Sequence, residues 1–166
     1  MIRATSIIRR DAVDADRIVD VITLDHRDRH RRRIALTADG GTSFLLDLDQ
    51  ADVLDDGDAI RLESGWLIEV RAAPERLVEV RTGDPPALLT LAWHIGNRHV
   101  PVEITVDAIY IAYDHVLVDM LQGLGAETRI VERPFRPVRG AYHHHGHDGH
   151  SHHHHEHNHL HGHTHE

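Results

Sequence analysis

Histidine is the residue whose number and spacing most clearly indicate chemistry in this sequence. Of the 19 histidines, 14 fall within residues 142–166, the histidine-rich tail, where small and polar residues separate them. An imidazole with an ordinary pKa of about 6.5 is mostly neutral at pH 7 and offers a lone pair to Ni(II), Zn(II) or Cu(II). The tail therefore predicts a binder of several metal ions, with candidate ligands His143, His144, His145, His147, His150, His152, His153, His154, His155, His157, His159, His161, His163 and His165.

A purification tag is the alternative explanation for this tail. Against it, the histidines are interrupted irregularly, and the tail contains Asp148, Glu156 and Leu160, which a simple tag does not need. Because the tail lacks apolar periodicity, we expect it to be disordered in the absence of metal. Metal binding should weaken steeply below about pH 6, since a protonated imidazole is not a ligand.

Outside the tail, His99 is the histidine best placed to hold a metal ion. Gly96 and Asn97 adopt positive φ readily and predict the end of a helix, which places His99 at the start of the next strand. One imidazole supplies only one of the roughly four to six donors that zinc or nickel takes. Since a two-fold axis would supply a second copy of His99, we expect a homodimer with the ion at its axis.

Three further residues could bind metal less directly. His94 lies five residues before His99, about 140° away around a helix, so the two cannot face one ion, and a partly buried helical histidine is the simpler interpretation. Tyr113 and His115 flank Asp114, the predicted N-cap of a second helix. The helix dipole keeps His115 unprotonated but also repels a cation, so we treat both residues as auxiliary ligand candidates.

His26 and His30 have the i, i+4 spacing of a helical chelate. Arginines at 27, 29 and 31–33 surround them, however, and this charge opposes binding of a divalent ion. We interpret the stretch as a hairpin loop with a solvated basic face. A docking patch for an acidic partner protein is the alternative, whereas a nucleic-acid role lacks interleaved aromatic residues.

The elements that position these residues indicate an α+β fold. Residues 1–74 predict a β-rich domain, because runs of β-branched and apolar residues alternate with turns. Strands are expected at 18–24, 34–37, 44–48, 59–62 and 66–70, and residues 49–54 are a candidate for a single helical turn. Residues 75–141 predict a ferredoxin-like βαββαβ domain for metal binding and dimerisation, followed by the tail.

Helical spacing supports this second domain. Apolar residues fall on one face of a helix at Leu88, Leu91, Ala92 and Ile95, and on one face of a second helix at Leu117, Met120, Leu121 and Leu124. Asp84 and Asp114 are the predicted N-caps. Strands are expected at 77–81, 100–106, 108–113 and 128–131.

Composition excludes several classes of protein. A net charge of −9 argues against a general nucleic-acid binder, and the absence of cysteine removes disulfides and thiolate catalysis. No secretory signal, long apolar run or catalytic motif is visible, so we expect a cytoplasmic carrier and not an enzyme. A histidine-rich storage or detoxification protein and a zinc-dependent enzyme remain alternatives.

The stretch Gly96-Asn97-Arg98-His99-Val100-Pro101, with Asp114-His115-Val116-Leu117 opening a helix, resembles the UreE family of urease accessory metallochaperones. The order of β-rich domain, ferredoxin-like domain and histidine-rich tail matches that family over essentially the whole chain. The resemblance implies a cytoplasmic homodimer that binds Ni(II) and delivers it to the urease apoprotein, working with a GTPase of the urease maturation complex.

The resemblance also assigns roles to residues. The family histidine that matches His99 comes from both subunits and holds the interfacial metal. Some members carry histidines at the positions of Tyr113 and His115, where this sequence has tyrosine at the first. The first domain of the family resembles a peptide-binding module of heat-shock chaperones, which would suit protein docking.

Overall fold

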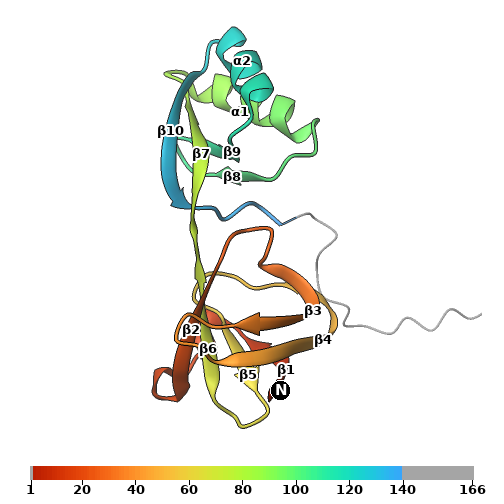
Figure 1. Ribbon diagram of the computed structural model, residues 1–166. Helices are drawn as coiled ribbons and strands as arrows, with labels where there is room; N and C mark the ends of the chain where they lie inside the picture. Colours follow the sequence, from red (N-terminus) through yellow and green to blue (C-terminus); the bar gives the residue numbers. More distant parts are fainter. Residues whose placement is uncertain (1, 140–166) are drawn as a thin grey trace, which may run out of the picture.

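The computed structural model of the protein describes residues 2–139, which form two sheets, two α-helices and two short 3-10 helices. In Figure 1 the six-stranded sheet of the N-terminal half lies below the four-stranded sheet with its helices. The strands are β1 (Ile2–Ile8), β2 (Ile18–Leu24), β3 (His30–Thr37), β4 (Ser43–Val53), β5 (Ala59–Leu62), β6 (Leu67–Ala72), β7 (Pro74–Arg81), β8 (Val102–Ile104), β9 (Ile109–Ala112) and β10 (Glu127–Pro134). The helices are η1 (Arg10–Ala12), η2 (Ala15–Arg17), α1 (Pro85–Gly96) and α2 (His115–Gly123).

The predicted fold class is confirmed for this part of the chain: a β-rich N-terminal half precedes a βαββαβ domain. The division of the chain after residue 74 remains a prediction, and the tail predicted to be disordered lies outside the described residues. Neither α-helix in residues 2–139 is long and apolar enough to span a bilayer.

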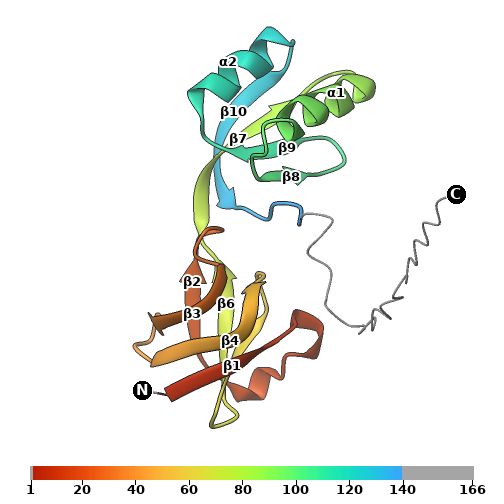
Figure 2. The ribbon, with the colours of Figure 1, turned by 90° about the vertical axis from the view of Figure 1, so that its right-hand side faces the viewer.

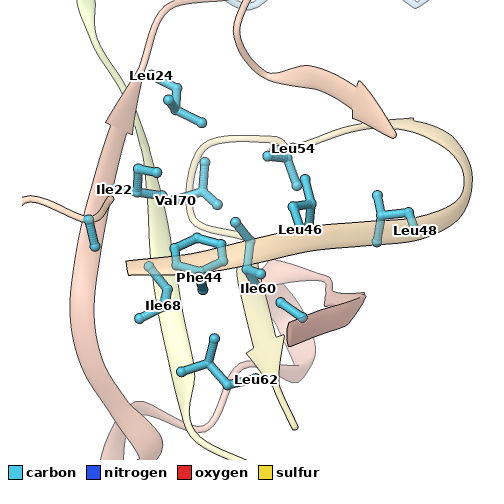
Figure 3. Close-up of a cluster of buried hydrophobic side chains, with 12 residues drawn as sticks. Ile22, Leu24, Phe44, Leu46, Leu48, Leu54, Ile60, Leu62, Ile68 and Val70 are labelled. Carbon is cyan, nitrogen blue, oxygen red and sulfur yellow. The ribbon is translucent and has the colours of Figure 1, made fainter. Parts of the chain in front are cut away.

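The N-terminal sheet has the order β2-β6-β5-β1-β4-β3 and curls around one apolar core. Figure 3 shows the ring of Phe44 among Ile60, Ile68 and Val70, all fully buried. Strands β2 and β5 have their predicted bounds, whereas β3, β4 and β6 differ from prediction by a few residues. Strand β1 was not predicted, because within it only Ala4 is buried and the alternation is weak.

The prediction of a helical turn at residues 49–54 is wrong. Strand β4 continues to Val53, where it pairs with His30 of β3. The register with β3 jumps from Asp47 to Asp52, so β4 bends between these residues without leaving the sheet. Tertiary pairing therefore overrides the local preference of a short polar stretch.

A set of hydrogen bonds joins edge strand β2 to the turn between β3 and β4. The N–H of Asp39 donates to the carbonyl of Val21 at 2.7 Å, and Asp20 accepts from the N–H groups of Gly40 at 2.8 Å and Thr42 at 3.1 Å. Together with the Thr42 side chain, these donors lower the pKa of Asp20 to about 2. A Cβ on Gly40 would lie 2.6 Å from Oδ1 of Asp20, so this approach needs glycine.

The C-terminal domain is an antiparallel sheet of order β10-β7-β9-β8 with both α-helices on one face, as Figure 2 shows. Leu91 and Ile95 of α1 and Leu117 and Leu121 of α2 are buried against the sheet. Leu124, predicted to belong to this apolar face, follows α2 and is 46% exposed. Strand β8 is shorter than predicted.

The two predicted N-caps behave differently. Asp84 is the residue before α1, but its side chain makes no capping hydrogen bond. The carboxylate of Asp114 accepts from the N–H groups of Val116 at 2.8 Å and Leu117 at 3.2 Å, so it caps α2 as predicted.

The opposite face of this sheet carries a charged network. Glu79 is buried and accepts hydrogen bonds from the Tyr110 hydroxyl and from Nε of Arg129, both at 3.0 Å. Burial raises the pKa of Glu79, but the bonds from Arg81, Tyr110 and Arg129 together lower it below its ordinary value. The guanidinium of Arg133 lies 4.0 Å above the Tyr110 ring.

Candidate metal site

Helix α1 ends at Gly96, as predicted, and leads directly into the turn that carries His99. The N–H of Arg98 donates to Ile95 and that of His99 donates to Gly96, both at 3.0 Å. The expectation that Gly96 or Asn97 would take positive φ is wrong. Asn97 continues in a right-handed conformation, and the left-handed step falls on His99, at a φ of 54°.

His99 is the one non-glycine residue with positive φ among residues 2–139. This conformation costs an ordinary residue on the order of 1–3 kcal/mol, and such residues concentrate at functional sites. The turn leaves the side chain exposed, directly before Val100 and Pro101. The backbone therefore presents the imidazole outward from the end of α1.

His94 is half-buried, which agrees with its interpretation as a helical residue and not a ligand partner of His99. Its ring lies edge-on to Trp93 with ring centroids 5.0 Å apart. Its carbonyl accepts a hydrogen bond of 2.8 Å from Arg98. This contact ties the side chain of Arg98 to the last turn of the helix.

Tyr113 and His115 lie at the same end of the β8–β9 hairpin as His99. Val102 pairs with Ile111 in the antiparallel ladder. The segment that precedes Val102 and carries His99 therefore leaves the hairpin at the same end as the segment that follows Ile111 and carries Tyr113 and His115. Both Tyr113 and His115 are exposed. The guanidinium of Arg76 lies 4.4 Å from the centre of the Tyr113 ring, and this cation discourages a second positive charge at the same ring.

His26 and His30 do not form a helical chelate, because they lie in and after the turn that joins β2 to β3. The stretch is a turn, but the predicted hairpin is wrong, because β2 and β3 lie at opposite edges of the sheet. The predicted solvated basic face is also wrong in part. Arg29 is only 2% exposed, and it donates a hydrogen bond to the carbonyl of Phe135, the residue after β10. The turn is therefore part of the junction between the two halves of the chain.

A pocket of about 620 Å³ lies at this junction and brings three histidines to one place. His26 and His30 contribute from the N-terminal half, and His99 contributes from the C-terminal domain. The remaining wall is formed by Arg29, Val53, Asp55, Val100, Pro101, Arg136, Pro137, Val138 and Arg139. Sequence spacing gave no sign that His26 and His99 share a pocket.

Residues 2–139 contain no group of three His, Asp or Glu side chains close enough to hold an ion. Imidazole donors suit Ni(II) or Zn(II). The tail candidates, His143 to His165, lie outside the described residues, and the described chain ends at Arg139 on the wall of the pocket.

Comparison with known proteins gives one consistent result. The family model "UreE urease accessory protein, N-terminal domain" matches residues 4–73, and the model for the C-terminal domain matches residues 75–165. A urease accessory protein UreE of Azorhizobium caulinodans is 63% identical over 142 residues, which cover 86% of this chain and 68% of that protein. A UreE of Chelativorans sp. is 54% identical over 142 residues, covering 86% of this chain and 87% of that protein.

Proposed function

Because the chain belongs to the UreE family of urease accessory proteins, we propose that it binds Ni(II) and delivers it during assembly of the urease active site. The conformation of His99 is the observation that carries this proposal. A strained, exposed turn holds the imidazole away from the body of the domain, where an ion can be gained and released. The ion is cargo, so its ligands must be accessible and reversible.

A homodimer would complete the site at His99. Leu89 and Trp93 lie one turn apart on α1 and are 74% and 64% exposed, although both are large apolar side chains. Burying them against a second copy is favourable and would bring the ends of the two α1 helices, and hence the two His99 residues, towards one axis. Tyr113 and His115 are auxiliary ligands of the same region.

The histidine-rich tail collects the metal ion in this proposal. Its 14 imidazoles bind Ni(II), and the ion is transferred between the tail and the paired His99 residues. The partners are the urease apoprotein and its maturation complex, including a GTPase, and the setting is the cytoplasm. The N-terminal half docks proteins, and the chain acts as a carrier without catalysing a reaction.

A nickel or zinc storage protein is the second candidate, and the number of tail histidines favours it. The two candidates differ in how much metal stays bound when the chain is truncated after Arg139. The truncated chain retains the apolar core of the N-terminal half and that beneath α1 and α2. A carrier keeps one tightly bound Ni(II) per dimer, and a His99→Ala substitution removes it. A storage protein loses nearly all bound metal with the tail, and that result in equilibrium dialysis would reject the carrier.

A further inference from the structure

The guanidinium of Arg29 is buried at the junction of the two halves without a carboxylate partner. The residue is only 2% exposed, and its side chain donates to the carbonyl of Phe135. Its Nε is also buried and makes no hydrogen bond. Removing a guanidinium from water is costly unless an opposite charge and a full set of hydrogen bonds compensate it. Within residues 2–139, that compensation is incomplete for Arg29.

Arg29 differs in this respect from the other charged residues that are buried in the described part of the chain. The other three are carboxylates, and each of them forms an ion pair with an arginine. The pairs are Asp58 with Arg9 at 2.7 Å, Glu79 with Arg129 at 2.7 Å and Glu103 with Arg133 at 2.6 Å. The rule that buried charges are paired therefore holds at these positions and fails at Arg29.

The acidic residues nearest to this junction are already engaged by other groups. Asp55 pairs with Arg139. Asp56 accepts hydrogen bonds from Arg136 at 2.6 Å and from the backbone N–H of Ala72 at 2.8 Å. The two exposed arginines thus take the two available carboxylates, and the charge of Arg29 is left over.

Arg29 is one of the residues that line the pocket of about 620 Å³ beside His99. In Figure 1 the turn between β2 and β3, which carries Arg29, reaches the segment that follows β10. Glu75 fixes one side of this pocket, because its Oε2 lies 2.7 Å from Nδ1 of His26. The volume falls in the range of sites that bind small organic ligands.

The walls of the pocket indicate the chemistry of such a ligand. A guanidinium presents a planar fork of N–H donors that matches the two oxygens of a carboxylate. Beside it lie aliphatic side chains, which favour contact with a hydrocarbon group over contact with a small hydrated anion. These are Val53, Val100, Pro101, Pro137 and Val138.

We propose that the pocket at the junction binds an organic carboxylate, whose anionic group pairs with Arg29 and whose hydrocarbon part packs against the valines and prolines. A free organic acid and a glutamate side chain of another polypeptide carry the same group, and the experiment below separates these two sources. The site is distinct from the proposed nickel function, because it requires no metal ion.

The test is calorimetry on the full-length, metal-free protein at pH 8, where the histidines are neutral and do not attract anions. We expect saturable binding of one glutarate per chain, no binding of the uncharged diamide glutaramide, and phosphate binding at least about tenfold weaker. Absence of saturable glutarate binding up to about 20 mM, or equal binding of phosphate, overturns the proposal. A glutamate residue blocked at both ends tests the source. Binding as tight as that of glutarate indicates a polypeptide, and weaker binding indicates a free acid.

Two exposed valines provide a matched pair of variants. Val138 lines the pocket and is 61% exposed, whereas Val116 lies at the start of α2 and is 62% exposed. Val138→Asp should weaken glutarate binding at least about fivefold, because it places a like charge beside the ligand. Val116→Asp adds the same charge elsewhere and should leave the affinity unchanged. Equal affinities for the two variants would contradict the proposed location.

Arg29→Met examines the guanidinium itself, because methionine keeps an unbranched apolar chain and removes the charge. Loss of the buried cation should weaken glutarate binding by about 30-fold or more. Circular dichroism establishes whether this variant folds, and Val138→Asp decides the question if it does not. A folded Arg29→Met protein that binds glutarate as tightly as the wild type overturns the proposal.

Discussion

The imidazole of His26 meets the phenyl ring of Phe135 edge to face, at an interplanar angle of 83°, and joins the two halves of the chain. Phe135 is fully buried, and its carbonyl accepts a hydrogen bond from the buried Arg29. The N–H of Leu54 in turn donates to the carbonyl of Arg29 at 2.7 Å. The junction is thus packed and hydrogen-bonded, and the pocket beside His99 depends on it.

Replacing Phe135 with alanine should therefore destabilise the protein and loosen this junction. Loss of a buried phenyl ring costs about 3–5 kcal/mol of unfolding free energy, because it removes apolar burial and leaves a cavity. Urea denaturation measures the change. Val138→Ala is the control, since Val138 is 61% exposed and should cost less than about 0.5 kcal/mol. Equal effects of the two substitutions would show that Phe135 does not anchor the junction.

Asp20 should make stability depend on pH at the acid end. Its pKa is lowered to about 2, chiefly by hydrogen bonds from the Thr42 side chain and from the N–H groups of Val21 and Gly40 to the ionised carboxylate. The folded pKa lies below the unfolded value of about 3.9, so the stabilisation is complete above that value and is lost as pH falls towards 2. Asp20→Asn should lower unfolding free energy by about 1–2 kcal/mol at pH 7 and by little near pH 2.

Thermal denaturation over this pH range tests the role of Asp20, with Asp49→Asn as a control at an exposed position. A difference between wild type and Asp20→Asn that is as large at pH 2 as at pH 7 would contradict it. Gly40→Ala should act in the same direction, because the added methyl group displaces the Asp20 carboxylate.

The exposed apolar face of α1 should control self-association. Trp93→Ala is expected to weaken the homodimer by about 30-fold, corresponding to about 2 kcal/mol for an aromatic residue at the centre of an interface. Sedimentation velocity over a range of concentrations measures the dissociation constant. Ile2→Ala, at a partly exposed position in the N-terminal sheet, should leave it unchanged. Equal dissociation constants for both variants would place the interface elsewhere.

Nickel binding by the full-length chain should collapse between pH 7 and pH 5. With a pKa of about 6.5, roughly three quarters of tail imidazoles are neutral at pH 7 and about 3% at pH 5. Because only the neutral ring binds a metal, the number of Ni(II) ions per chain should fall several-fold. Equilibrium dialysis at the two pH values checks this, and an unchanged stoichiometry would show that imidazoles are not the principal ligands.

Local patterns were sufficient to predict much of the fold. The apolar spacing of α1, the cap at Asp114 and the β-branched run of β2 each depend on neighbouring residues, and the structure agrees with them. Strand β1 could not be predicted in this way, because it is stabilised by pairing with β4 and β5, far along the sequence. The same reason explains why residues 49–53 remain in strand β4.

The candidate site was predictable only where it depends on residues that are neighbours in the sequence. His99 follows from the end of α1, although its positive φ does not, since the sequence offers Gly96 and Asn97 as better candidates. Glu75 and Phe135 carried no signal, because their contacts with the turn at His26 cross 49 and 109 positions of the chain. Burial of Arg29 at the junction could not be predicted for the same reason, because four similar arginines lie within four residues of it.

The most direct test of the central claim is anomalous diffraction at the nickel edge from crystals of the nickel-loaded full-length protein. We predict one strong nickel peak on a two-fold axis, within bonding distance of an imidazole nitrogen from each His99. Two His99 rings that lie far apart and face solvent separately, with no nickel between them, would contradict the account.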